Sequence, residues 1–252
     1  MSLITPEKDR VENPIKTNIT LKASKGDFVA YDKEEKTTTV LPENLEFIVL
    51  EVLFGAEGVT GTGTGKDKKY TSYYSNMVKN TAKQELVITC RDSSGGKGEY
   101  ARGKWSDIKG TMEKKASYTI YLLAKVKGID GVTKLTLSSG ARGAWFDGKR
   151  KSKDAPAIIN EEEGSIKVKE LTFIEDGAFS RHVPVFETIK FNDKEYTAAK
   201  ELIEPLIEYL ATDMTEQVTE TEEDSSPELD KAVSDTFEIV DGKPVLTSDQ
   251  PF

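Results

Sequence analysis

The amino-acid sequence predicts a β-rich α+β domain, folded as a partly open antiparallel barrel with helical insertions and a C-terminal helix. Three observations lead to this prediction. Short runs of β-branched and aromatic residues recur along the chain, turn residues separate them, and few segments show helical periodicity. The 252 residues suffice for one domain of this kind with appendages at its ends.

The expected strands are recognised by apolar alternation or by runs of branched residues. Residues 45–54, LEFIVLEVLF, form the most apolar run and end at Gly55, which is typical of a buried strand. Residues 85–91 and 97–102 flank the turn at Gly95-Gly96 and so resemble a hairpin. The remaining strands are expected at residues 15–23, 28–31, 37–40, 117–127, 132–138, 157–159, 165–174 and 183–189.

Three segments show the pattern of helices. Residues 103–115 place apolar side chains at helical spacing, and residues 139–153 suit a short helix or a loop. Residues 197–211 are amphipathic, and we expect Pro205 to kink them because proline lacks the backbone N–H that a helix needs.

A glycine- and threonine-rich stretch at residues 58–66, GVTGTGTGK, is expected to form a flexible loop. It does not match a P-loop, because Asp67 follows Gly65-Lys66 where that motif has serine or threonine. Either it is a plain surface loop between strands, or it is a mobile loop whose lysines close over phosphates.

Charge divides the chain into three parts. Residues 1–14 are polar and end at Asn13-Pro14, which is typical of a mobile arm. Residues 213–252 hold twelve acidic residues against two basic ones and show almost no periodicity, so we expect a disordered acidic tail. The body at 15–212 has a basic middle, because residues 60–153 hold twenty Lys or Arg against eight Asp or Glu. A basic surface joined to an acidic tail is typical of nucleic-acid-binding proteins.

A single cysteine and a single histidine exclude several function classes. Cys90 cannot form an internal disulfide, and with His182 it cannot complete a zinc site of the usual His/Cys type. We expect Cys90 to be a small core residue and His182 to start a strand. No spacing of carboxylates demands acid–base catalysis, although a nuclease that holds its metal with carboxylates alone stays open. We therefore expect no cofactor, no metal and no enzymatic activity.

The sequence shows no membrane-spanning segment. No run of about 18 apolar residues exists, and the first residues lack the apolar stretch of a secretory signal. Together with the lone cysteine, this predicts a cytoplasmic protein with no membrane partner.

Aromatic and basic residues alternate in three segments, and this pattern favours single-stranded nucleic acid as a ligand. Phosphates need positive charge and bases need flat apolar partners, and stacking contributes about 1–3 kcal/mol per base. The alternative is that rings such as Trp145 and Phe146 fill the core while the lysines form a solvated face. The candidate binding residues are Lys66, Lys68, Lys69, Tyr70, Tyr73, Tyr74 and Lys79 in the first segment, Tyr100, Arg102, Lys104 and Trp105 in the second, and Arg142, Trp145, Phe146, Lys149 and Arg150 in the third.

The acidic tail ends in an apolar tip, Ser248 to Phe252. Asp249 and the terminal carboxylate can meet basic residues of a partner, and Phe252 can enter a small apolar pocket. The tail can also fold back onto the basic middle and compete with nucleic acid. A solubilising tail without a partner is the simpler alternative.

At this tip the chain resembles the single-stranded-DNA-binding proteins, whose acidic tails end in Pro-Phe or Phe in bacterial and many phage members and recruit replication and repair proteins. Pro251-Phe252 matches that tip, with Asp249 two residues before Pro251. Over residues 20–190 the body resembles a group of phage-encoded single-strand binders, through FVAYDK at Phe28–Lys33 and GAWFD at Gly143–Asp147. The resemblance implies an oligonucleotide-binding (OB) barrel, and it implies DNA rather than RNA as the ligand.

The sequence thus supports two alternative hypotheses about the function. The first is a sequence-tolerant single-stranded-DNA-binding protein that coats and protects DNA during phage replication, recombination and repair in the host cytoplasm, and recruits replication proteins through its tail. The second is a non-catalytic phage structural or interaction protein with the same barrel and no groove. The sequence leaves the oligomeric state open.

Overall fold

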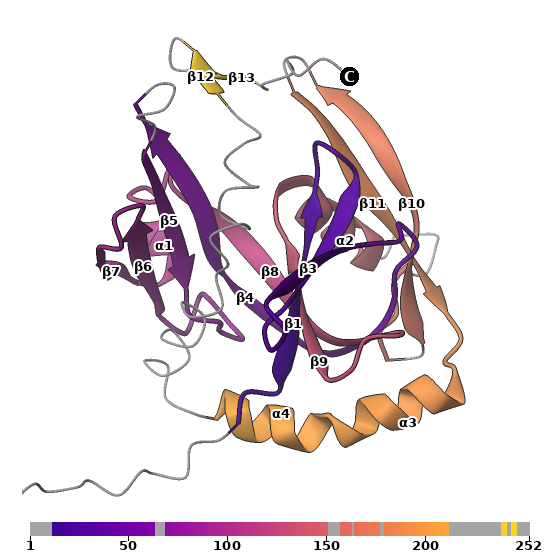
Figure 1. Cartoon of the computed structure of the whole chain (residues 1–252). Helices are drawn as coiled ribbons and strands as arrows, with labels where there is room; N and C mark the ends of the chain where they lie inside the picture. Colours follow the sequence, from indigo (N-terminus) through magenta and orange to yellow (C-terminus); the bar gives the residue numbers. More distant parts are fainter. Residues whose placement is uncertain are drawn as a thin grey trace, which may run out of the picture.

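The computed structural model describes residues 12–63, 69–150, 157–162, 164–176, 179–211, 238–240 and 243–245. An 11-stranded mixed sheet dominates it, and a few helices lie against the sheet (Figure 1). The prediction of a β-rich α+β fold is confirmed. None of the described helices is long and apolar enough to cross a membrane.

Ten of the eleven strands of the large sheet were expected from the sequence, and β5 was not. They are β1 (Ile15–Lys22), β2 (Asp27–Asp32), β3 (Thr37–Leu41), β4 (Glu46–Thr62), β5 (Lys69–Ser75), β6 (Leu86–Asp92), β7 (Lys97–Gly103), β8 (Ser117–Val126), β9 (Val132–Leu137), β10 (Ser165–Asp176) and β11 (Phe179–Ile189). The helices are α1 (Trp105–Ile108), α2 (Ser139–Lys149), α3 (Asp193–Glu201) and α4 (Ile203–Leu210).

Within the predicted tail the structure describes two short paired strands, β12 (Glu238–Val240) and β13 (Lys243–Val245). The rest of the tail, with Asp249, Pro251 and Phe252 at its tip, lies outside the described residues, as do residues 1–11 of the predicted N-terminal arm.

The large sheet has the strand order β3-β2-β1-β9-β8-β4-β5-β6-β7, with β10 on β4 and β11 on β10. The sequence predicted an antiparallel barrel, and this is wrong for one pair of strands, because β1 and β9 run parallel. A parallel pair needs a long connection, and the strands between β1 and β9 supply it. The sheet is curled, so that β11 lies next to the turn between β1 and β2, where the His182 amide donates to Ala23 O at 2.7 Å. This single contact closes the curled sheet only in part.

The longest strand, β4, spans 17 residues and joins the two halves of the sheet. It pairs with β10 at Phe47, with β8 along Phe47–Glu57, and with β5 along Glu57–Thr62. The expected loop at residues 58–66 is therefore wrong for residues 58–62, which continue β4. At Gly58 a side chain has no room, because a Cβ atom there would lie 2.1 Å from Lys115 O.

The helices differ from the expected ones in length and in where they begin and end. Residues 103–115 form only the short α1 followed by turns, while residues 139–149 are a helix, α2. The C-terminal helix breaks at Leu202 into α3 and α4, so that Pro205 lies in the first turn of α4, where its missing N–H costs least.

Residues 157–159 were expected to form a strand, which is wrong: they are irregular. Ile159 is nonetheless buried, since its amide donates to Gly148 O at 3.0 Å and its side chain packs on that glycine. Close packing against α2 replaces the expected strand pairing.

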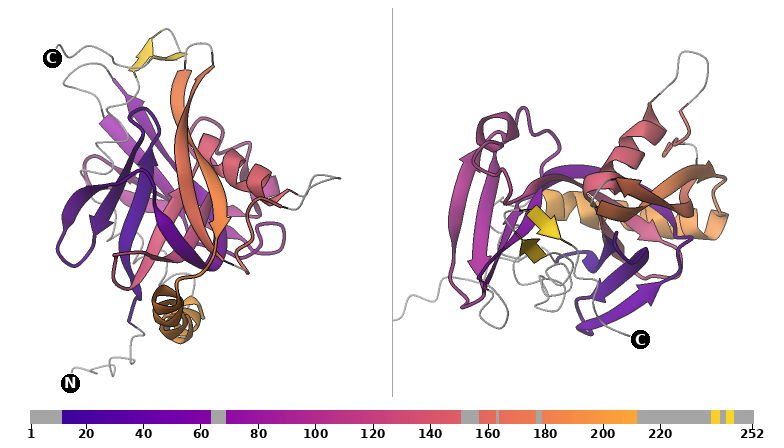
Figure 2. Two further views of the ribbon diagram at one scale, coloured as in Figure 1. Left: turned by 90° about the vertical axis from the view of Figure 1, so that its right-hand side faces the viewer. Right: turned by 90° about the horizontal axis from the view of Figure 1, so that it is seen from above.

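Three apolar clusters form the core. One fills the inside of the curled sheet, a second lies between the sheet and α4, and a third lies under β5–β7. Seen from above in Figure 2, β5–β7 lie on one side of the molecule and β1–β3 lie on the opposite side. The β5–β7 part and the curled part meet along β4 and β8, and the candidate site lies beside that junction.

Candidate nucleic-acid interface

An open, shallow pocket of about 460 Å³ gathers aromatic and arginine side chains from separate parts of the chain. The turn after β5, the short helix α1, the start of β8 and the helix α2 each contribute to its wall. The lining residues are Thr81, Trp105, Tyr118, Arg142, Gly143, Phe146, Asp147 and Arg150. Four of them belong to the predicted binding residues, from the second and third segments.

Two of the lining rings, Trp105 and Tyr118, belong to a stack of three rings with Tyr118 at its centre. Phe54 lies parallel to Tyr118, with ring centroids 5.8 Å apart and planes 15° apart. Trp105 lies on Tyr118 at 5.8 Å with a 41° tilt. The register explains the first contact, because Phe54 on β4 and Tyr118 on β8 occupy diagonal positions on one face of the sheet. The stack therefore rests on the β4–β8 pairing and is held in place by it.

Arg142 is fixed against the same stack. Its guanidinium donates a hydrogen bond to the Tyr118 carbonyl and lies 5.8 Å from the centroid of the Tyr118 ring. The Tyr118 hydroxyl lies 3.4 Å from the Thr81 hydroxyl. A charge that is already oriented loses less conformational entropy when a ligand binds. Arg142 thus provides a preorganised positive group beside flat rings.

Arg150 and Asp147 form the outer rim. The Arg150 guanidinium lies 3.1 Å from the Asp147 carboxylate, and both side chains are largely exposed. Such an exposed pair is weak, so Arg150 can exchange its partner for a phosphate. Arg150 also follows the last turn of α2, where the helix dipole favours positive charge.

Trp145 is a correction to the predicted binding surface. It is 1 % exposed and lies edge-on to Phe186 at 5.4 Å inside the curled sheet. Phe146, the next residue of α2, is 39 % exposed and lines the pocket. Successive helix residues point about 100° apart, so one ring fills the core and its neighbour faces solvent. A base cannot stack on Trp145 in this arrangement.

Tyr73 and Tyr74 are a second correction, because both are buried. The second half of β5 is covered on both faces, so strand alternation exposes neither ring. Tyr73 packs in the core under β5–β7 and lies edge-on to Tyr100 at 5.2 Å. Tyr100 occupies a bulge in β7 and is partly exposed, with the Lys115 ammonium 4.8 Å from its centroid.

Besides Arg150, three more of the predicted cations are paired with carboxylates in the structure. Lys79 bonds Glu51 at 2.5 Å and Arg102 bonds Glu99 at 2.7 Å, while Lys149 pairs with Glu161. The Glu99 pKa is lowered because the Arg102 guanidinium bonds the carboxylate.

Three further predicted residues of the first two segments are not among the lining residues of the pocket. Lys69 at the start of β5 and Lys104 before α1 are exposed, and Tyr70 is half-buried. Lys66 and Lys68 lie outside the described residues. The structure thus brings the second and third segments together at Trp105 and α2, and it does not bring the whole basic middle into one site.

Tyr118 is the functional candidate that sequence reasoning missed. It alternates in phase with core residues such as Ile120, so its pattern predicted only burial. The signal that separates it is its place next to the last pair of the β4–β8 ladder.

The single histidine and the single cysteine contact groups that belong to the packing of the fold. His182 Nδ1 lies 3.1 Å from Ala23 O and its ring packs on Phe173, while Cys90 borders the cluster under β5–β7. Among the described residues, no three His, Cys, Asp or Glu side chains are grouped to hold a metal ion.

Comparison of the chain with protein-family models, with curated proteins and with solved structures gave no match.

The contrast between Trp145 and Phe146 gives a test of the site. Trp145→Ala empties a core position and should lower the free energy of unfolding by about 3–5 kcal/mol. Phe146→Ala removes a partly exposed ring and should lower it by less than about 1 kcal/mol. Urea unfolding followed by circular dichroism measures both. The two changes are in one helix, so helix propensity cancels, and equal destabilisation would contradict the placement of these rings.

Proposed function

We propose that this protein is a non-catalytic, sequence-tolerant single-stranded-DNA-binding protein. The observation that carries the proposal is the pocket itself, in which Trp105 and Phe146 offer flat rings while Arg142 and Arg150 offer positive charge. Proteins that bind single strands without sequence preference combine these two elements. A partly closed, curled sheet supports the pocket, and we propose that it serves as an OB-like barrel.

The pocket suits a single strand better than a duplex. Its rings are reached from solvent, and a base must leave its helical stack to lie flat on them. Stacking is sequence-tolerant because every base has a flat face. The arginines then contact the phosphates on either side of that base, which orients the strand without reading its sequence.

The acidic tail completes the proposal. Residues 213–252 carry twelve acidic residues against two basic ones, so they repel DNA and attract basic surfaces. We propose that the tip at Asp249, Pro251 and Phe252 recruits replication and recombination proteins, while the body coats the strand in the cytoplasm of a phage-infected cell.

The competing function is a structural or interaction protein. The pairing of Lys79, Arg102 and Lys149 with carboxylates favours it, because these cations are partly neutralised within the chain. A structural protein would show no affinity for oligonucleotides even at low salt, which separates the two functions.

We expect Phe146→Ala to weaken binding to a fluorescein-labelled oligo(dT) about tenfold at low salt, since one stacked base is worth about 1–3 kcal/mol. Fluorescence anisotropy measures the dissociation constant. Phe173→Ala is the matched control, because Phe173 is also exposed but lies on β10, away from the pocket.

Arg150→Gln should also lower the slope of log affinity against log salt by about 0.7, the value for one phosphate contact with a single strand. Unchanged affinity in Phe146→Ala, or equal losses in Phe146→Ala and Phe173→Ala, would contradict the pocket as the binding site.

Deletion of residues 213–252 should leave the affinity for oligo(dT) equal or higher, because a competing polyanion is removed. The same anisotropy titration, run beside the full chain, measures this. A clear drop in affinity would show that the tail takes part in binding and would overturn its proposed role as a competitor.

A further inference from the structure

Two lysine side chains are buried on the face of the large sheet that lies opposite the pocket. Lys125 on β8 and Lys134 on β9 are each 8 % exposed. Successive residues of a strand point to opposite faces, so Lys125 lies on one face of β8 and Tyr118, which lines the pocket, lies on the other. Lys134 pairs with Leu123 of β8 and therefore shares the face of Lys125. A buried ammonium group is costly unless other groups bond it, so the partners of each lysine are informative.

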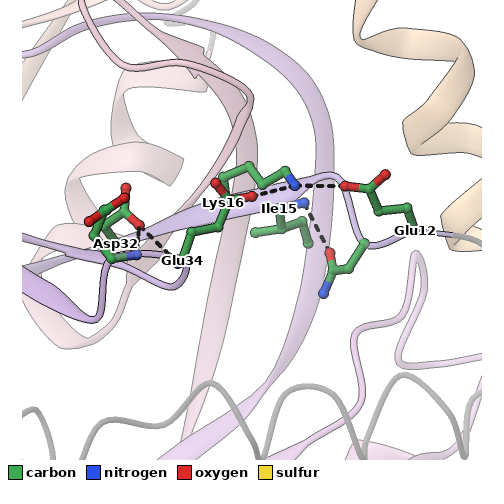
Figure 3. Close-up of polar contacts among 7 residues, drawn as sticks. Glu12, Ile15, Lys16, Asp32 and Glu34 are labelled. Atoms are coloured by element: carbon green, nitrogen blue, oxygen red, sulfur yellow. Dashed lines mark hydrogen bonds and ion pairs between the residues drawn. The ribbon is translucent and has the colours of Figure 1, made fainter.

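Lys125 and a third lysine, Lys16, find their partners within the chain. The Lys125 ammonium donates to the Ile129 carbonyl in the turn between β8 and β9. Lys16 lies at a bulge in β1 and donates to Glu34 at 2.6 Å and to Glu12 at 2.8 Å (Figure 3). These bonds to a carbonyl and to carboxylates replace hydrogen bonds that the two ammonium groups would make with water.

Lys134 differs, because no described residue forms an ion pair or a hydrogen bond with its ammonium. The contact that the structure gives this group is with the Tyr121 ring, whose centroid lies 5.4 Å away. Burial and the nearby Glu57 carboxylate raise the Tyr121 pKa well above its usual value, so the phenol stays neutral and does not offset the lysine charge. A ring face attracts a cation weakly and leaves donors of the ammonium unused. Within the described part of the chain, Lys134 is thus a buried positive charge without a counter-ion.

Other polar groups lie beside Lys134 on this face. Asn18 is its partner in the parallel pairing of β1 with β9, and the Asn18 Oδ1 atom is buried with no hydrogen-bond partner among the described residues. Thr20 and Thr136 form the next pair of these two strands on the same face, and Thr136 is 7 % exposed. The ammonium and the two hydroxyls can donate hydrogen bonds, whereas the amide oxygen needs a donor. A ligand that satisfies this set must offer negatively charged oxygens and one hydrogen-bond donor.

We propose that Lys134, Asn18 and the two threonines form a binding site for inorganic phosphate or a phosphate monoester. Such a phosphate carries a charge of about −1.5 to −2 at neutral pH, so part of its population keeps one proton. Its charged oxygens accept hydrogen bonds from the Lys134 ammonium and from the threonine hydroxyls. Its P–O–H group donates to Asn18 Oδ1, the acceptor that otherwise has no partner in the described structure.

Other oxyanions fit these groups less well. Sulfate has the same tetrahedral shape but holds no proton at neutral pH, so it cannot donate to Asn18. The carboxylates of residues 213–252 and the internal phosphodiesters of a nucleic-acid strand lack that proton too. The site lies on the other face of the sheet from the pocket, so it goes beyond the proposed DNA contact and does not depend on it.

A lysine that is kept for binding should lower the stability of the protein when no ligand is present. Urea unfolding in phosphate-free buffer measures this. Lys134→Met should unfold at the same or a higher urea concentration than the unchanged chain, because it removes an unpaired buried charge. Lys125→Met is the matched control and should unfold at a lower concentration, since the Ile129 carbonyl loses its donor. If Lys134→Met were the less stable of the two variants, Lys134 would have a structural role and the proposal would be overturned.

Isothermal titration calorimetry of the full chain with inorganic phosphate, and separately with sulfate, measures the site itself. We expect phosphate to bind about fivefold more tightly than sulfate, the gain of about one hydrogen bond. Lys134→Met should weaken the binding of both anions at least about tenfold, because the charge that attracts them is lost. Lys125→Met should bind both as the unchanged chain does. Asn18→Ala should remove the preference for phosphate, since the acceptor of its proton is gone.

Two oligo(dT) strands, one with a 5′-phosphate and one with a 5′-hydroxyl, distinguish the source of the phosphate. If the phosphorylated strand binds more tightly and Lys134→Met abolishes the difference, the ligand is the end of a strand. If both strands bind equally and inorganic phosphate still binds, the ligand is a free phosphate, and either result supports the site.

Three results of the phosphate titration would overturn the proposal. They are a full chain that binds neither anion at millimolar concentration, equal affinities for sulfate and phosphate, and unchanged phosphate binding in Lys134→Met. Phosphate binding that appears only after deletion of residues 213–252 would assign Lys134 to the carboxylates of the tail and would also overturn it. The titration contains no DNA, so a failure of oligo(dT) to bind the pocket leaves its result unchanged.

Discussion

The pairing of β4 with β8 is the constraint on which the rest of this structure depends. β4 is shared between the curled sheet and the β5–β7 hairpins, and at Glu57 it pairs with Ser117 of β8 on one side and with Tyr74 of β5 on the other. Just before that point, Phe54 exchanges backbone hydrogen bonds with Val78 at 2.8 and 2.9 Å. The register therefore fixes the junction of the two parts, and the Phe54–Tyr118–Trp105 stack lies against it. A change that shifted this register by one residue would turn these rings to the opposite face.

The chemistry of the pocket follows from this placement. The Tyr118 ring is positioned by the β4–β8 pairing, and Arg142, bonded to the Tyr118 carbonyl, stays beside that ring. Asp147 lowers the positive potential of the rim, and the rings add stacking to the charge of Arg142 in the proposed DNA contact. The proposal therefore describes a binder that uses a small number of rings and two arginines. Coating a strand would then need many copies along the DNA.

The sequence predicted the strands well and the site only in part. Apolar alternation is a local property, so β1, β6 and β9 could be located from residues alone. The extension of β4 through Gly58 could not, because it depends on the close approach of Lys115 from a distant turn. Trp145 and Phe146 show the same limit: their composition predicts either a core or a binding role, and only the packing of α2 on Phe186 decides between them. Tyr118 was missed since its alternation matches that of the core. Local pattern thus gives the elements, while long-range packing decides which rings reach solvent.

Photocross-linking tests the central claim most directly. A complex of the full chain with a short oligonucleotide containing 5-bromouracil is irradiated, and the linked peptides are identified by mass spectrometry. The account predicts cross-links at Trp105, Tyr118 or Phe146, which line the pocket, and none at Phe173, which is exposed on β10. Cross-links confined to β10, or spread over the surface without regard to the pocket, would contradict it.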